Sequence, residues 1–524
     1  MGDRRVDWEN MKEAPASTLA SILQQAVQLH QRGRYEAALA LYRQVLDIAP
    51  RQFDALHLSG VIARQLGQPE RAAALIADAI AIDPSQAAAH CNLGAALQDA
   101  GRAAEALASY ERALALKPDY ALAFGNRGNA LRKLGRLEDA LASYERALAL
   151  RPAYPEAWCQ HAIALQDLGR SAAALDSAER ALAGRAAYPE AWCARGQALQ
   201  GLRCFEEALA SYERAIALAP DSAEAYCWRG TAQQRLRRFE DALHSYERAV
   251  ALRPGYALAH QYRANTLRAL QRTGQAVAAY RTALERGGDP AQIAYALAAI
   301  GAGGAPNASP VDYVKGLFDQ YADHFDRHLL EVLAYRTPAL LDAAIRRALP
   351  PDAPARLDTL DLGCGTGLCG HYLRAYSGTL TGVDLSPKML EKAAQSGLYD
   401  ELLCDELQRF LSGRVDRYDL IVAGDVFVYL GDLAPVFAQA HQALRPGGSF
   451  CFSVEAAEAE EGPDMCLRPS NRYAHSLPYL RRLALAAGFD VLEAESHPAR
   501  QEHGVAIMAY AMLLRSLKRQ ADAA

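Results

Sequence analysis

The chain has 524 residues, 51% of them hydrophobic, so it is long enough for two or more folded domains. A net charge of −5 disfavours a nucleic-acid-binding surface that extends over the whole chain. Ten cysteines without any C-x-x-C pair favour reduced thiols and a cytoplasmic location.

The first eighteen residues are polar and lack the apolar core of a signal peptide. No run approaches the roughly 18 apolar residues that a membrane span requires. We therefore expect an N-terminal polar segment at 1–18, no membrane span, and no metal site.

Prolines recur along the first half of the chain at intervals of 34 residues, or of twice 34: Pro50, Pro84, Pro118, Pro152, Pro220 and Pro254. Tyrosines keep the same period, at Tyr42, Tyr110, Tyr144, Tyr212, Tyr246 and Tyr280. Each period contains two amphipathic segments, the first with a glycine and the second built on Ala-Leu-x-x-Tyr-Glu-Arg-Ala. The pattern predicts stacked helix pairs in which most aromatic side chains belong to the core.

This period resembles the tetratricopeptide repeat. The resemblance implies about eight repeats over 19–288, stacked as an all-α superhelix with a concave face. Such arrays hold peptides, so we expect a protein or peptide partner in the repeat groove. Amides at Asn92, Asn126 and Gln160 share one phase and could bind an extended backbone, although solvated polar side chains are the alternative.

Residues 289–310 change in character and are predicted to be a linker. The stretch from Gly301 to Pro310 is rich in residues that break helices, which predicts a flexible hinge. Within the following segment, 311–345, Tyr321 and Phe325 recur with helical spacing.

A strand–turn–helix pattern begins at 357–362, a short apolar run that leads into the turn Gly363-Cys-Gly-Thr-Gly367. Asp384 ends a second short strand, and an acid at that place can accept hydrogen bonds from both ribose hydroxyls of an adenosyl ligand. The third glycine comes one position earlier than in a dinucleotide turn. Asp361, two residues before the turn, suits a cationic ligand end.

The pattern D-x-G-x-G-x-G with a downstream acid is similar to class I S-adenosylmethionine-dependent methyltransferases. The whole chain resembles bacterial proteins that couple tetratricopeptide repeats to such a domain. The resemblance implies an α/β Rossmann-like domain over 311–524 that uses S-adenosyl-L-methionine, with an N-terminal helix that folds over it as a lid. The implied cofactor-binding residues are Asp361, Gly363, Cys364, Gly365, Gly367, Asp384, Leu385, Asp405, Gly424 and, in the lid, Tyr321. Ordinary packing on the sheet is the alternative for Tyr321 and Phe325.

Strand-like and helix-like segments alternate after the glycine turn, which predicts a parallel sheet covered on both faces. Strands are expected at 379–383, up to 403, at 418–422 and at 449–454, with a final pair at 489–495 and 505–514. A helix is expected over 473–488.

The loop Gly424-Asp-Val-Phe427 contains no proline, unlike the corresponding loops of DNA methyltransferases, so we expect no nucleic-acid acceptor. Polar residues near the expected edge of the sheet are Asp425, Tyr429, Glu455, Arg472, Tyr473 and His475. Of these we select Tyr429 and His475 as catalytic candidates, in case the acceptor needs a general base. The alternative for His475 is a capped helix start.

We therefore predict an S-adenosylmethionine-dependent methyltransferase whose repeats recruit a protein or carrier-bound acceptor. One alternative is methylation of a free small molecule, with the repeats used for assembly. Another is a non-catalytic repeat scaffold, which the intact glycine turn disfavours. The identity of the acceptor stays open.

Overall fold

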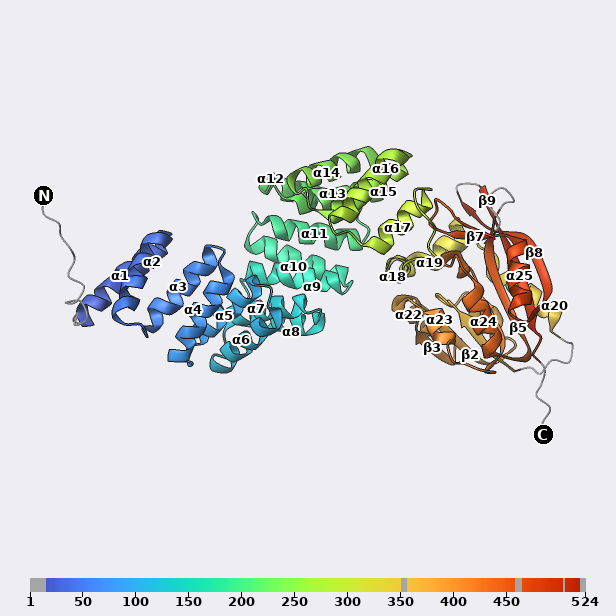
Figure 1. Cartoon of the computed structure of the whole chain (residues 1–524), viewed down its shortest axis with the longest axis horizontal. Helices are drawn as coiled ribbons and strands as arrows, with labels where there is room; N and C mark the ends of the chain where they lie inside the picture. Colours follow the sequence, from blue (N-terminus) through green and yellow to red (C-terminus); the bar gives the residue numbers. More distant parts are fainter. Residues whose placement is uncertain (1–15, 350–355, 458–463, 503–504, 519–524) are drawn as a thin grey trace, which may run out of the picture. The chain divides into compact units, whose positions relative to one another are not determined.

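The computed structural model describes residues 16–349, 356–457, 464–502 and 505–518 (Figure 1). The polar segment predicted at 1–18 lies almost entirely outside these residues. Residues up to Leu270 form one compact unit, and residues from Gln271 form a second. Among the described residues, no helix combines the length and apolar character that crossing a bilayer requires.

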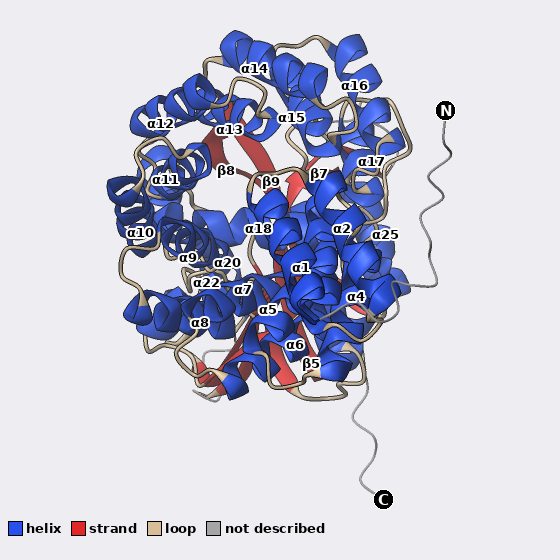
Figure 2. Cartoon of the chain, turned by 90° about the vertical axis from the view of Figure 1, so that its left-hand side faces the viewer, coloured by secondary structure: helices blue, strands red, loops and turns tan. Residues whose placement is uncertain are grey.

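The first unit consists of helices that pack in consecutive pairs (Figure 2). They are α1 Ala16–Gln31, α2 Tyr35–Ile48, α3 Phe53–Gln65, α4 Pro69–Ile82, α5 Ala87–Asp99, α6 Ala103–Leu116, α7 Ala121–Lys133, α8 Leu137–Leu150, α9 Pro155–Asp167, α10 Ser171–Gly184, α11 Pro189–Gly201, α12 Phe205–Leu218, α13 Ala223–Arg235, α14 Phe239–Leu252 and α15 Ala257–Ala269. The helix pairs follow the period of 34 residues, which confirms the predicted repeat superhelix.

Close glycine–tyrosine contacts hold the two helices of a repeat together. A Cβ atom on Gly94, Gly128, Gly196 or Gly230 would lie 2.5–2.7 Å from the ring of the tyrosine sixteen residues later. Those tyrosines are at most 1% exposed. Only glycine allows the two helix backbones to approach this closely, so the periodic glycine has a packing role.

Two of the predicted groove amides bond between neighbouring repeats. The side-chain nitrogen of Asn92 lies 2.9 Å from Nε2 of His57, and that of Asn126 donates to the sulfur of Cys91 at 3.8 Å. These contacts tie adjacent repeats, and the proposed contact of the amides with a peptide stays a prediction.

The second unit begins with α16 and contains every described strand. Its α-helices are α16 Thr273–Glu285, α17 Pro290–Ala299, α18 Val311–Tyr321, α19 Phe325–Arg327, α20 Thr337–Ala348, α21 Gly370–Leu373, α22 Pro387–Gln395, α23 Leu407–Leu411, α24 Ala434–Ala443 and α25 Leu477–Ala486. Its strands are β1 Leu357–Leu362, β2 Ser377–Asp384, β3 Glu401–Cys404, β4 Tyr418–Ala423, β5 Leu444–Ala456, β6 Met465–Leu467, β7 Tyr473–His475, β8 Phe489–Glu502 and β9 Val505–Ser516. Short 3-10 turns occupy Ala322–His324 and Phe427–Tyr429, and a π-helical turn occupies His328–Val332.

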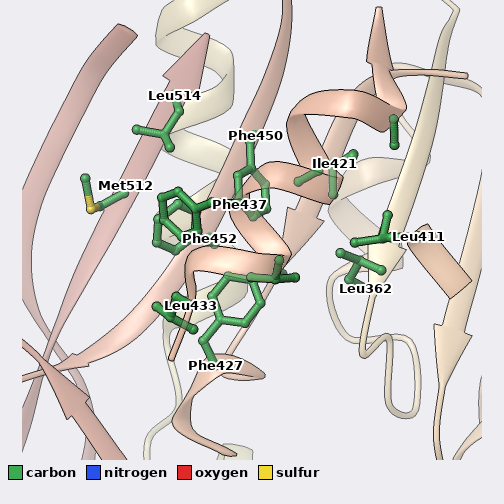
Figure 3. Packing of buried hydrophobic residues seen from close by; sticks show 14 of the residues in the cluster. Leu362, Leu411, Ile421, Phe427, Leu433, Phe437, Phe450, Phe452, Met512 and Leu514 are labelled. Carbon is green, nitrogen blue, oxygen red and sulfur yellow. The ribbon is translucent and has the colours of Figure 1, made fainter. Parts of the chain in front are cut away.

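The described strands form one mixed sheet. Parallel strands run in the order β3-β2-β1-β4-β5, and β9 then pairs antiparallel with β5 and with β8. Side chains alternate between the two faces, as a sheet requires. Phe450 and Phe452 pack with Phe437 of α24 on one face (Figure 3), and Cys451 packs with Leu341 of α20 on the other. This is the predicted Rossmann-like sheet with helices on both faces.

The structure corrects the predicted helix at 473–488. Residues Tyr473–His475 form β7, which pairs in parallel with the end of β5, and α25 begins only at Leu477. The chain enters that helix through Ser476, whose hydroxyl accepts a hydrogen bond from the Tyr479 N–H. The predicted strands were located correctly, although β5, β8 and β9 are longer than expected, and β6 and β7 were not predicted as strands.

The hinge predicted at 301–310 is held against the sheet domain at its end. The carbonyl of Pro306 accepts from the Tyr473 hydroxyl at 2.5 Å, and that of Asn307 accepts from the Gly431 N–H at 2.7 Å. The N–H of Ser309 donates to the Tyr429 carbonyl at 2.8 Å. The composition of 301–310 suggested flexibility, since composition alone does not reveal these tertiary hydrogen bonds. The predicted domain boundaries stay predictions, and the two compact units divide earlier, after Leu270.

Candidate functional site

A cavity of about 310 Å³ lies at the carboxyl ends of β1, β2 and β4. Open α/β sheets bind ligands at this edge. Its lining comes from the glycine turn, the ends of the strands, the loops after β3 and β4, the segment 308–338 that precedes the sheet, and Arg472. The cavity therefore lies entirely within the second unit.

The glycine turn has the backbone conformation that its sequence predicts. Gly363, Gly365 and Gly367 have φ of +66°, +56° and +96°. A Cβ atom on Gly363 would also lie 2.4 Å from Cγ2 of Val426. Gly363, Cys364 and Gly365 line the cavity, whereas Gly367 is outside its lining. Their binding of a cofactor stays a prediction.

Asp384 lies at the end of β2 and in the cavity wall. Its Oδ2 accepts from the Gly365 N–H at 2.9 Å, and its Oδ1 accepts from the Ser386 N–H at 2.8 Å. Burial raises the pKa of this carboxyl, and these backbone donors oppose the rise. Each oxygen keeps a further lone pair that can accept a bond from a ligand hydroxyl.

Asp361 lies beneath the turn and outside the cavity lining. Its side chain is 1% exposed, and its Oδ2 accepts from the Tyr399 hydroxyl at 2.7 Å. Its Oδ1 is buried and has no hydrogen-bond partner among the described residues. Burial raises the pKa of Asp361 to about 7, and the nearby charge of Asp384 adds to the rise. A cation bound above the turn would favour its ionised form.

The remaining predicted cofactor residues of the sheet domain line the cavity: Leu385, Asp405 and Gly424. Asp405 is already engaged, because it forms an ion pair with Arg409 and accepts from the Glu406 N–H at 2.8 Å. A Cβ atom on Gly424 would lie 3.0 Å from the sulfur of Cys369, so the wall is tightly packed there.

The segment that precedes the sheet covers the cavity. Val311, Val314 and Phe318 of α18, with Phe325 of α19, line it. Two side-chain hydrogen bonds hold this cover in place: the Ser386 hydroxyl donates to Asp319 at 2.6 Å, and the Thr366 hydroxyl donates to Asp326.

The two aromatic lid candidates have different positions. Phe325 lines the cavity, whereas Tyr321 is outside the lining and its hydroxyl bonds to Nδ1 of His328. The assignment of Tyr321 to the cofactor stays a prediction, and the aromatic side chains of this segment that line the cavity are Phe318 and Phe325.

The two catalytic candidates also differ in their position relative to the cavity. Tyr429 lines the cavity, and burial raises its pKa. His475 is outside the lining and fully buried, with Nε2 2.9 Å from the Gly431 carbonyl and its ring stacked on Tyr479. Burial lowers the pKa of His475 to about 4. Because Nε2 donates to a backbone carbonyl, we assign His475 to packing of the loop after β4.

Sequence reasoning placed Asp425 near this site without selecting it, and did not identify Arg500. Asp425 and Arg472 line the cavity. Arg500, 2% exposed, lies between Asp425 and Glu455, with which it forms ion pairs. No motif in the sequence identifies Arg500, because it comes from β8, far along the chain from both acids.

A methyltransferase-domain family model matches residues 360–450, which include the end of β1, the glycine turn and β2 to β4. Tetratricopeptide-repeat models match residues 29–97, 87–120, 128–169, 205–236 and 223–256. The chain joins tetratricopeptide repeats to a methyltransferase domain. The repeats are thus in the N-terminal part and the methyltransferase domain is in the C-terminal part, as the sequence predicted.

Methyltransferase relatives resemble the second part of this repeat–methyltransferase chain. Methyltransferase-like protein 27 of Homo sapiens is 34% identical over 139 residues, 26% of this chain and 56% of its own length. Malonyl-(acyl-carrier protein) O-methyltransferase of Enterobacter lignolyticus is 28% identical over 188 residues, 36% of this chain and 71% of its own. Across the first three curated relatives, the chain spans 35%, 56% and 71% of the relative's length.

Solved repeat proteins resemble the first part. A tetratricopeptide repeat protein from Parabacteroides merdae matches 46% of this chain and 95% of its own, with 19% identity and a TM-score of 0.40.

Proposed function

We propose that the protein is an S-adenosylmethionine-dependent methyltransferase whose repeats recruit a protein or carrier-bound acceptor. The observation that carries the cofactor assignment is the pairing of the glycine turn with Asp384. Both line one cavity at the carboxyl edge of the sheet, and the Gly365 N–H bonds directly to Asp384. In the proposal, Asp384 accepts the ribose hydroxyls and Asp405 borders the adenine end.

The residues around the cavity fit this ligand. Asp361 lies beneath the turn, and one of its carboxylate oxygens is buried without a hydrogen-bond donor among the described residues. The positive charge of a cationic ligand end bound nearby would balance the charge of this carboxylate. When bound, S-adenosylmethionine would supply a methyl group on a sulfonium, which needs no metal. The described residues contain no cluster of side chains suited to hold one.

The cover over the cavity supports a transfer reaction. Phe318 and Phe325 place aromatic rings in the wall, 5.9 Å apart between centroids, and Phe318 also packs edge-on to Tyr429 at 5.5 Å. Such a cover excludes water and orients the acceptor, which is most of what a methyl transfer requires of the protein.

The repeat array supports a recruited acceptor. Tetratricopeptide arrays present a long groove for peptides, and one relative of the second unit acts, by its name, on a carrier-bound acceptor. A free small molecule would need no such array.

Transfer of labelled methyl from S-adenosylmethionine to a cell extract tests the proposal, with products scored as protein, lipid or small molecule. A fragment of residues 271–524 should keep cofactor binding, because the second unit begins there. It should lose transfer to protein. Undiminished transfer by the fragment would favour the free small molecule, and a full chain that binds cofactor without turnover would favour the scaffold.

A further inference from the structure

The loop after β4 presents a carboxylate to the cavity in an unusual backbone conformation. Asp425 lines the cavity and has φ of +59°, a left-handed conformation that non-glycine residues adopt uncommonly. Its N–H donates to the Ser453 hydroxyl at 2.8 Å, so β5 holds the turn. The surrounding structure thus maintains this side chain in the wall against its local preference.

The two oxygens of Asp425 have different surroundings. Oδ2 lies 3.4 Å from Nη1 of Arg500, whose side chain is 1% exposed and which also pairs with the equally buried Glu455. Oδ1 is buried and has no hydrogen-bond partner among the described residues. A buried carboxylate oxygen without a donor is costly, and a ligand that supplies a donor at this point would account for it.

Hydrogen-bond chemistry restricts that ligand. An ionised carboxylate only accepts, so the partner of Oδ1 must carry an N–H or an O–H. A carboxylate acceptor has no such hydrogen when ionised, and its charge would be repelled by Asp425. Tyr429 and Arg472 line the same cavity and would border the rest of the acceptor.

We infer that Asp425 binds the methyl acceptor through Oδ1 and takes up its proton, and that the acceptor is an amine or a hydroxyl compound. This inference rests on the proposed methyl transfer. The lone pair of the acceptor nitrogen or oxygen forms the new bond to the methyl carbon, while the carbon–sulfur bond breaks and its electron pair stays on sulfur. The acceptor proton passes to Oδ1 and then to solvent. Arg500 keeps Oδ2 occupied, which leaves Oδ1 for the acceptor.

The variant Asp425→Asn tests the inference, because it keeps the size of the side chain and removes the base. Transfer of labelled methyl from S-adenosylmethionine to a cell extract should fall at least about 100-fold, the lower bound for loss of a general base. Affinity for S-adenosylhomocysteine, measured by calorimetry, and the melting temperature should change little. Formate should restore part of the activity of Asp425→Ala, which a purely structural role would not allow.

A matched control is Asp416→Asn. Asp416 also has a left-handed backbone, with φ of +48°, but its side chain is 48% exposed and pairs with Lys518 away from the cavity. This variant should keep the wild-type transfer rate.

Three results would overturn the inference. They are transfer by Asp425→Asn within twofold of wild type, loss of S-adenosylhomocysteine affinity in parallel with transfer, and a product that releases methanol in mild base, as a methyl ester does. A wild-type chain that binds no S-adenosylhomocysteine would instead overturn the proposed function, and the inference with it.

Discussion

The repeat unit and the methyltransferase unit differ in how far apart in the sequence their contacting residues lie. In the repeat unit four glycines, Gly94, Gly128, Gly196 and Gly230, each meet a tyrosine sixteen residues later, and the contact recurs with the period of the sequence. In the methyltransferase unit the cavity joins residues from 308 to 472, and Arg500 pairs with acids 45 and 75 residues away. A change in one repeat leaves the equivalent contacts of the other repeats in place, whereas each residue of the cavity has no equivalent among the other described residues of the unit.

The largest expected effect concerns the buried Asp361 of the methyltransferase unit. Its native pKa of about 7 exceeds the ordinary value of 3.8, so the folded state holds a proton that the unfolded state has lost between these two pH values. The free energy of unfolding therefore falls as pH rises through this window, by as much as about 4 kcal/mol from this group. Asp361→Asn should remove that part of the pH dependence.

Unfolding in urea at several pH values measures this effect, as the difference between wild type and Asp361→Asn at each pH. All four tryptophans precede residue 270, so their fluorescence follows only the repeat unit. Hydrogen exchange of peptides from β1 and β2 must therefore report the methyltransferase unit. If the free energy of unfolding changes with pH in the same way in both proteins, the raised pKa of Asp361 is contradicted.

The next effect concerns the cofactor. Asp384→Ala should weaken S-adenosylhomocysteine binding by about 1.5–3 kcal/mol, the range for hydrogen bonds to a charged group. Calorimetry measures the change, with Asp490→Ala, an exposed aspartate of β8, as control. Unchanged affinity in Asp384→Ala would show that the ribose is held elsewhere.

A smaller effect is expected in the repeat unit. Gly128→Ala would bring a Cβ within 2.5 Å of the Tyr144 ring, and overpacking of this kind costs about 1–3 kcal/mol. Gly255→Ala, whose Cβ would meet open space, is the matched control and should be close to neutral. Tryptophan fluorescence during urea unfolding measures both. If the contact is local, cofactor affinity should be unchanged in Gly128→Ala.

The smallest effect concerns α17, which contacts the sheet domain within the second unit. The Tyr295 hydroxyl donates to the Asn471 carbonyl at 2.6 Å and accepts from the Ser309 hydroxyl at 2.7 Å. Tyr295→Phe should cost about 1 kcal/mol and speed hydrogen exchange over 290–310. Tyr372→Phe, an exposed tyrosine of α21, is the control. Unchanged hydrogen exchange in Tyr295→Phe would favour the prediction of a flexible hinge at 301–310.

Much of this molecule follows from sequence, because its signals are local. The period of 34 residues predicts the helix pairs, since each repeat uses the same few contacts. The turn at 363–367 predicts its own backbone, because only glycine readily adopts three positive φ values in such a short turn. Together these signals predicted the types of both domains and the conformation of the turn that lines the cavity.

Other features were decided only by the tertiary structure. Tyr321 and Phe325 have the spacing of one helical face, but α18 ends at Tyr321 and a 3-10 turn follows, so only Phe325 lines the cavity. His475 is drawn into a strand by pairing with β5 and is buried. The pairing of Asp425 with Arg500 requires that β8 return beside the rest of the sheet. Sequence spacing carries no information about contacts between elements that are distant in the chain, and those contacts select the residues that surround the acceptor.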